Sequence, residues 1–561
     1  MGNKIVISIF LAFYALSAVA QNLDPTVEVS REYEGKLVEV HKPSFEMAVP
    51  DSVTRFALDF DYSVFENPYK GSYEFDPYLL SMKPSASDSG ESGFYLRAGA
   101  GYQLHPTLDL VWSPGFANKG FNVDLYAKHR SFVGKYLSCL PESGSDDWSG
   151  YDLLNSAGAA FRHDWEKIAL EYSAGYYGLA QQDRVWARTF NAFDASFGIH
   201  TKPQDAQSMV FDLDVDYRLG ADGVGTSSLR ESLGGIKVNM GPIGFRDHMV
   251  GVDAEVNIAK YTGAFDLNGG DVSLTPRYVF RKERFMADLG VRISKMLTKE
   301  KLKEQYVYPD VNLSVIIFPK SLKFYLKANG GGEFENYSST IASNHHITHY
   351  LPQDILGYEI ERIRLTVGLD GRITDKFSYN LRGGYANYAS LRHYQLDMAE
   401  VPSFSMTYLS CQKWFAAVDW ALDIEGFRFD GSVSYDRYWN KSDVYFGGVA
   451  GANAVLRPAQ LTGKTAVQYN WKNRLVCGAD CEFSDAMKGT YAIKEPSSDL
   501  VPIQEVMIRG YADVGLFAEY ATARNLSLWM RVGNLLNQTI QRTPLYAEKG
   551  VFCTLGICMN L

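Results

Sequence analysis

The chain ends in VFCTLGICMNL, residues 551–561, a stretch in which two kinds of position alternate. The odd-numbered positions are all apolar: Val551, Cys553, Leu555, Ile557, Met559 and Leu561. The even-numbered positions are mixed: Phe552, Thr554, Gly556, Cys558 and Asn560. Successive side chains of a β-strand point to opposite sides. One face of this strand is therefore suited to an apolar environment and the other to water.

The same alternation recurs from about Gly93 to the last residue, for example over residues 209–219, 250–258, 287–293, 363–373 and 508–518. We count about 22 strands, with an uncertainty of about four. Short turns alternate along the chain with longer polar loops, and outer-membrane barrels sort their connections in this way. The pattern therefore predicts an all-β chain in which residues 93–561 form a transmembrane antiparallel β-barrel. The alternative is a soluble β-sandwich or propeller array, which has no reason to sort loop lengths by parity.

The alternation also places the connections between strands. Short turns are expected near Gly241–Gly244, Glu425–Gly426 and Lys472–Asn473, among others. Longer loops are expected near Gln181–Ala187 and Thr262–Gly270, among others.

Charged residues of both signs stand on the polar faces of these strands, and in a barrel they would face the lumen. The predicted lumen-facing charges are Asp212, Asp214, Asp216, Arg362, Arg364, Asp370, Arg372, Arg509, Asp513 and Glu519. Two interpretations remain open: a hydrated wall whose charges compensate one another, or a binding face for a plug segment or a solute. A barrel of about 22 strands has a wide lumen that something must fill.

The N-terminus predicts export. Lys4 precedes the short apolar stretch Ile5–Leu16, and Ala18-Val19-Ala20 is a small-x-small cleavage site. This arrangement is typical of a secretory signal peptide, so residues 1–20 are expected to be removed. Together with the strand pattern, it predicts a protein of the outer membrane of a Gram-negative bacterium, in contact with its lipid.

Residues 21–92 differ from the rest of the chain, because charges, prolines and aromatic residues are mixed there. We expect an N-terminal segment that lies in the periplasm or plugs the lumen. Residues 56–64 alternate like a single strand, and the alternative is that they form one more strand of the barrel.

The overall composition excludes one class of partner. The chain of 561 residues has 55 basic and 65 acidic side chains and a net charge of −10. A nucleic-acid partner requires a basic face, so none is expected.

The sequence contains one candidate metal site. His345, His346 and His349 lie within five residues in a predicted external loop and are candidate ligands for Zn²⁺ or Cu²⁺. Solvated loop histidines are the alternative. Among the ten histidines we recognise no Ser/His motif, so we expect no enzymatic activity and no cofactor.

The end of the chain carries a family resemblance. Trp529-Met-Arg-Val-Gly-Asn-Leu-Leu-Asn537, followed by a loop and Gly550-Val-Phe552, resembles the last two strands of TonB-dependent receptor barrels. The many aromatic residues and short turns are similar in style to outer-membrane proteins of Bacteroidetes. The resemblance implies solute uptake across the outer membrane, with TonB as a partner.

The chain also departs from that family. Residues 21–92 carry no recognisable plug domain, although Thr26, Val27, Glu28 and Val29 faintly resemble a TonB box. Two functions remain open. One is a porin-like or receptor-like barrel that passes a solute, and the other is a structural accessory barrel of an outer-membrane assembly or export complex.

Overall fold

The structure is a computed structural model. It describes residues 93–102, 104–115, 120–136, 148–182, 186–202, 210–245, 247–297, 306–319, 321–347, 357–397, 403–439, 454–492, 503–542, 546–548 and 550–561. The predicted signal peptide, the segment 21–92 with its TonB-box-like residues 26–29, and His349 lie outside the described residues.

The described part of the chain is built almost wholly of β-strands. The first thirteen are β1 Gly93–Tyr102, β2 Thr107–Ser113, β3 Phe121–Tyr136, β4 Trp148–Asp164, β5 Ile168–Gln182, β6 Ala187–Thr201, β7 Phe211–Val224, β8 Ser227–Phe245, β9 His248–Gly263, β10 Leu267–Lys282, β11 Phe285–Met296, β12 Val307–Phe318 and β13 Leu322–Phe334. After helix α2 (Tyr337–Ser343) follow β14 Tyr358–Arg372, β15 Phe377–Asp397, β16 Ser403–Ile424, β17 Phe427–Trp439, β18 Ala454–Arg457, β19 Leu461–Trp471, β20 Leu475–Ser484, β21 Met487–Ala492, β22 Ile503–Ile508, β23 Tyr511–Ala523, β24 Leu526–Gly533 and β25 Phe552–Asn560.

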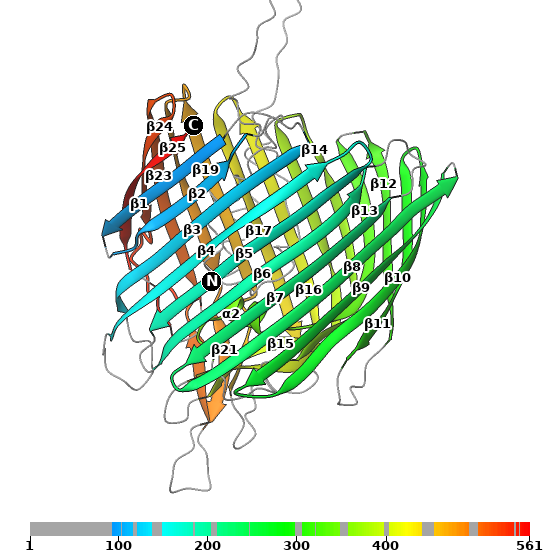
Figure 1. Ribbon diagram of the computed structural model, residues 1–561, viewed down its shortest axis with the longest axis horizontal. Helices are drawn as coiled ribbons and strands as arrows, with labels where there is room; N and C mark the ends of the chain where they lie inside the picture. The colour runs from blue at the N-terminus through cyan, green and yellow to red at the C-terminus, as the bar shows by residue number, and fades with distance from the viewer. Residues whose placement is uncertain are drawn as a thin grey trace, which may run out of the picture. The chain divides into compact units, whose positions relative to one another are not determined.

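The strands form a closed ring (Figure 1). Each ring strand pairs antiparallel with its neighbours, and β1 closes on β25, where Phe94 and Leu561 exchange two backbone hydrogen bonds of 2.8 Å. Of the 25 strands, β18, β21 and β22 lie outside the ring, which leaves 22. The predicted antiparallel barrel of about 22 strands is confirmed.

The two faces of the wall differ as the alternation predicts. Large apolar side chains are exposed on the outer face, including Leu219, Ile236, Val250, Val252, Ile258, Leu289, Val291, Ile293, Leu365 and Val367. A contiguous apolar surface of this kind is suited to lipid rather than to water. Among the described residues, no helix is both long and apolar enough to cross a bilayer.

The inner face carries charges that compensate one another. Arg277 on β10 lies 2.6 Å from Asp253, 2.9 Å from Asp288 and 3.1 Å from Asp310, which stand on β9, β11 and β12. One guanidinium therefore ties together four neighbouring strands. Its five N–H donors make such multiple pairing possible.

The two ends of the barrel differ. The C-terminus lies at the end with the short turns, which we call the turn end (Figure 1). Glu425 and Gly426 form one of these turns with φ of 36° and 87°, values typical of a primed hairpin turn. The opposite end, which we call the loop end, carries α2, β18, β21 and β22.

Three expected connections are placed differently. The expected turn at Gly241–Gly244 lies within β8, at a register shift, because β8 continues to Phe245 and β9 begins at His248. The expected loops at Gln181–Ala187 and Thr262–Gly270 are short links, because β5, β6, β9 and β10 extend farther than their apolar alternation. Backbone pairing continues into the polar stretches, where no apolar pattern marks the strand.

The apolar outer face generates the first prediction. Val291 is 46% exposed on the outer face of β11. Val291→Arg should reduce the free energy of unfolding from lipid vesicles by about 2–4 kcal/mol, the cost of a basic side chain near the bilayer centre. Val291→Leu at the same site should leave it almost unchanged. Urea titration in vesicles measures both, and equal stabilities would contradict a lipid-facing Val291.

Candidate functional site

The link from β13 to β14 folds inward and lies against the barrel wall. We call residues 335–347, which include α2, the α2 segment. Asn336 begins the helix, because its side chain accepts a 2.8 Å hydrogen bond from the backbone N–H of Ser339. Tyr337, Ile341 and Ile347 have no exposed surface. In Figure 1, α2 is seen within the outline of the barrel.

An apolar patch on the inner wall receives this segment. It consists of Leu179 on β5, Phe190 and Ala192 on β6, Leu229 on β8, and Ala259 and Tyr261 on β9. These residues form one buried cluster with Tyr337, Ile341 and Ile347. Apolar side chains on a wall that is otherwise charged would be costly in a water-filled lumen, so the α2 segment is stabilised there by apolar burial.

A buried ion pair fixes the position of the segment. Arg188 on β6 and Asp222 on β7 are 4% and 3% exposed, and Arg188 Nε lies 3.3 Å from Asp222 Oδ1. The hydroxyl of Tyr337 donates to Asp222 and accepts from Arg188 at 3.2 Å. Arg188 also donates to the carbonyl oxygens of His345 and Ile347. The guanidinium therefore bridges wall and segment.

A second set of polar contacts holds the start of the helix. Glu231 on β8 accepts from the Ser338 N–H at 3.0 Å and from the Ser338 hydroxyl at 2.6 Å. The hydroxyl of Tyr261 accepts from the Tyr337 N–H at 3.2 Å. Buried backbone donors at a helix start need such partners, because the helix itself offers them none.

Side chains from parts of the chain far from β5–β9 also contact this apolar cluster. Ile508 on β22 belongs to it, and Tyr408 on β16 and Tyr546 between β24 and β25 pack against it. In the pairing order, six strands separate β9 from β16. Side chains from distant parts of the ring therefore meet at the loop end, and the barrel mouth is bridged by the barrel's own segments.

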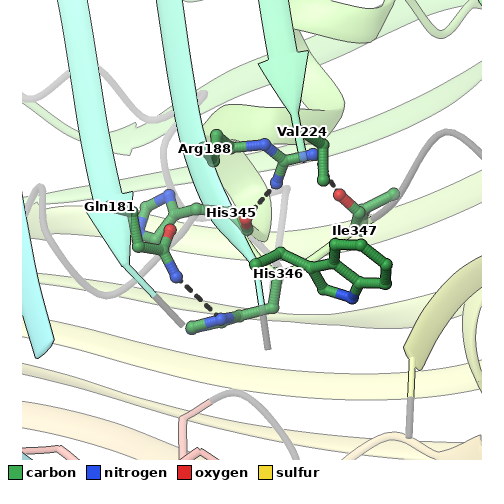
Figure 2. A pocket seen from close by; sticks show the side chains of 7 residues that line it. Gln181, Arg188, Val224, His345, His346 and Ile347 are labelled. Atoms are coloured by element: carbon green, nitrogen blue, oxygen red, sulfur yellow. Dashed lines mark hydrogen bonds between the residues drawn. The ribbon is translucent and has the colours of Figure 1, made fainter. Parts of the chain in front are cut away.

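A small pocket remains between the segment and the wall (Figure 2). It is lined by Gln181, Trp186, Arg188, Val224, His345, His346 and Ile347. Gln181 donates to His346 Nδ1 at 2.8 Å, and the His346 ring stacks on Tyr546 with a centroid distance of 3.5 Å and an interplanar angle of 11°. These contacts hold the His346 ring in place.

The predicted metal ligands are only partly within the described residues. His345 and His346 have ring centroids 6.1 Å apart, and His345 Nδ1 lies 3.2 Å from the carbonyl oxygen of Ile341. Within the described ranges, no group of three or more His, Cys, Asp or Glu side chains is arranged to hold a metal ion. His349 lies outside these ranges, so the three-histidine site stays a prediction.

Burial controls the charge state of two groups in the α2 segment. It lowers the pKa of His345 below its ordinary 6.5, and His346 and Arg188 act in the same direction, whereas Asp152 opposes them. Burial likewise raises the pKa of the Tyr337 hydroxyl well above 10, although Arg188 opposes this shift. The docked segment therefore carries a neutral imidazole and a neutral phenol.

The structure pairs several of the predicted lumen charges. Asp212 and Asp214 lie 3.4 Å and 3.5 Å from nitrogens of His200 on β6, and Asp216 follows on the same strand face. Arg364 lies 2.8 Å from Glu361. Asp370 and Arg372 follow Arg364 on β14 at alternate positions.

Pairs near the barrel closure include two more of the predicted charges. Asp513 accepts from Arg542 at 2.9 Å, and Glu519 lies 3.4 Å from Arg97. These contacts join β23 to β1 and to the link before β25.

Two of the predicted charges are placed differently. Arg362 stands at a register shift between Glu361 and Ile363, where simple alternation does not assign a face. Arg509 lies in the two-residue break between β22 and β23 rather than on a ring strand. The sequence 508–518 alternates without interruption, and nothing in that local pattern marks the break.

Sequence reasoning missed the residues that dock the α2 segment. Arg188, Asp222 and Glu231 were not singled out, because each looks like one more charge on an alternating strand. A signal was present in Tyr337, Ile341 and Ile347, three large apolar side chains in or next to the predicted external loop that contains the histidines. Their partners are distant in sequence, so only the closed ring shows the match.

Comparison with known proteins supports the fold. No protein-family model matches the chain, and no curated protein matches it. Solved structures do match: the copper transporter OprC has 13% identity and a TM-score of 0.61, over 86% of this chain and 82% of that chain. The chain therefore has the fold of an outer-membrane receptor barrel. The siderophore receptor PirA from Acinetobacter baumannii has 9% identity and a TM-score of 0.61, over 85% and 81%. The FrpB iron transporter from Neisseria meningitidis has 10% identity and a TM-score of 0.60, over 84% and 81%.

The buried ion pair generates the second prediction. Arg188→Met removes the cation and leaves Asp222 buried, which should weaken docking of the α2 segment by about 3–5 kcal/mol. Chymotrypsin should then cleave the detergent-solubilised barrel after Tyr337 faster than in the original protein. Arg162→Met is the control, because the Arg162–Glu171 pair is more exposed and lies beside the β4–β5 turn, at the opposite end of β5 from Leu179. Equal cleavage of both variants would show that Arg188 does not hold the segment.

His345 generates the third prediction. Docking keeps its pKa below 6.5, so the docked state binds fewer protons than the free state below that pH. The contribution of His345 to docking is therefore complete above about pH 6.5 and is lost as the pH falls below it, whereas Glu231, whose pKa burial raises to about 7, acts in the opposite direction. Amide hydrogen exchange of residues 337–347, corrected for intrinsic rates, measures this. His345→Asn, which keeps a donor for Ile341, should reduce the acid effect, and an undiminished effect would assign it to other groups.

Proposed function

We propose that the chain is an outer-membrane barrel that passes a solute across the outer membrane. The observation that carries the proposal is the closed ring of 22 antiparallel strands with an apolar outer face and a charged inner face. Such a ring satisfies every backbone group in lipid and encloses a polar path. The matched structures include a copper transporter, an iron transporter and a siderophore receptor, which supports the transport class without naming a solute.

TonB dependence and a Bacteroidetes-type origin belong to this proposal. TonB dependence is supported by the sequence resemblance of residues 529–537 and 550–552 and by the TonB-box-like residues 26–29, and the Bacteroidetes-type origin by the many aromatic residues and short turns. An extended segment of that kind would bind its partner by adding a strand to an exposed sheet edge. The predicted signal peptide agrees with export to this membrane.

A second candidate is favoured by one observation. The barrel mouth is bridged by a buried, ion-paired segment of the barrel itself. A permanently bridged mouth suits a structural accessory barrel that anchors other outer-membrane proteins. The two candidates differ in whether the lumen conducts ions when residues 21–92 and the α2 segment are removed.

Conductance in planar bilayers tests the proposal and is the fourth prediction. Four proteins are compared: the mature chain, a chain without residues 21–92, a chain in which a short Gly-Ser linker replaces residues 337–347, and the double variant. The mature chain should be closed, and the double variant should show a large, steady pore, since a 22-stranded ring is wide. A double variant that folds and stays closed would contradict transport and favour the accessory barrel.

A further inference from the structure

In the sheet formed by β13–β16, the pairing register shifts at one level of the barrel wall. Gly331, Glu361, Tyr388 and Cys411 are successive partners across β13, β14, β15 and β16. A register shift falls beside this row in β13, in β14 and in β15. Register irregularities of this kind bend the strand that carries them. We call this row the crease.

Within the described residues, the neighbouring ring strands stop pairing at the same level. β12 follows β13 only as far as the pair Asp310–Asn329, and β17 follows β16 only as far as Trp439–Gln412. Beyond the crease, β13–β16 pair with one another, and β15 also pairs with β18, which leads to β21 and β22. We call the described residues beyond the crease, 331–347, 358–361, 388–397 and 403–411, together with β18, β21 and β22, the flap.

Glycines allow close backbone approach at the crease. A Cβ on Gly330 would lie 2.8 Å from the carbonyl oxygen of Arg362 on the adjacent strand, and a Cβ on Gly332 would collide with the Met296 side chain. Both contacts are too close for a side chain. The run Gly330–Gly332 therefore lets β13 leave the ring at this level without a steric clash.

The flap reaches the opposite wall through the α2 segment. Tyr337 contacts Arg188 and Asp222, and Ser338 contacts Glu231. Tyr408, on the flap part of β16, packs against the same cluster. The flap is thus attached at the crease on one side and held on the other by these polar contacts and by the apolar cluster.

We propose that the flap is a hinged element that turns about the crease and closes the barrel mouth, with Tyr337 and Ser338 as its latch. When the latch is broken, the flap ends of β13–β16 leave the mouth together. The opening of a solute path by this motion rests on the proposed transport function, whereas the hinge itself does not. The motion needs no change in the 22-strand ring below the crease.

Hydrogen exchange with mass spectrometry tests the hinge and is the fifth prediction. The latch variant is Tyr337→Phe with Ser338→Ala, which removes the three side-chain latch contacts of the segment and leaves the Arg188–Asp222 pair on the wall. Ser339→Ala is the matched control, because among the residues that the structure describes the Ser339 hydroxyl bonds only to Glu335 and Asn336 of the segment itself. Tyr337→Phe alone serves if the latch variant folds poorly.

In the latch variant, amide exchange should rise about ten-fold or more in peptides from all four strands beyond the crease. Peptides of β13–β16 below the crease should keep their exchange rates, and Ser339→Ala should behave like the original protein. A rise confined to residues 337–347 would overturn the flap, because the segment would then move alone. A rise on both sides of the crease would overturn the hinge, and no rise would overturn the latch.

Conductance of the same variant separates this inference from the proposed function. If amide exchange rises in all four flap strands and new channel openings occur, both the hinge and the transport function are supported. Joint exchange without openings in a chain that also lacks residues 21–92 supports the hinge and contradicts transport. Openings without joint exchange would overturn the hinge and leave transport standing.

Discussion

A chain that crosses a bilayer as strands must give every backbone N–H and C=O a partner within the protein, because lipid offers none. This barrel meets the constraint by closing β1 on β25. The rest of the structure depends on that closure. It fixes the number of strands in the ring, puts the apolar residues of each strand outside, and brings the charged residues into a lumen wide enough to need a filling.

The lumen is organised by two different kinds of contact. Most of the inner wall carries exposed or half-buried ion pairs such as those of Arg277, which bridge adjacent strands and compensate one another. Near the loop end, the wall changes to an apolar patch with the buried Arg188–Asp222 pair at its edge. A buried charge pair is stabilising only when its remaining donors and acceptors are satisfied. Here the α2 segment supplies those partners, so wall and segment depend on each other.

The sequence predicts the part of the fold that rests on local alternation. Lipid on one side and water on the other impose period two on every strand, so the ring could be counted from patterns such as residues 551–561. The extent of the strands was harder to predict, because backbone pairing between β5 and β6 or β9 and β10 continues where side chains are polar. The break at Arg509 was missed for the opposite reason, since an uninterrupted alternation crosses it.

The candidate site could not be predicted in the same way. Arg188 and Glu231 acquire their roles from a segment more than a hundred residues away, and the crease depends on pairings across four strands. The histidines of the loop are recognisable from the sequence, and their role as metal ligands stays a prediction. The structure shows His345 against the wall and His346 stacked on Tyr546. At each of these positions, the contacts of the side chain depend on segments that are distant in the sequence.

The central claim is that the α2 segment crosses the mouth and rests on the wall formed by β5–β9. A distance measurement by double electron–electron resonance tests it most directly, with spin labels at Ser339 and at Thr226 in the β7–β8 turn. The native cysteines are replaced, and the barrel is reconstituted in lipid. The account predicts one short, narrow distance distribution. A broad distribution centred at long distances would show that the segment is not docked and would contradict the account.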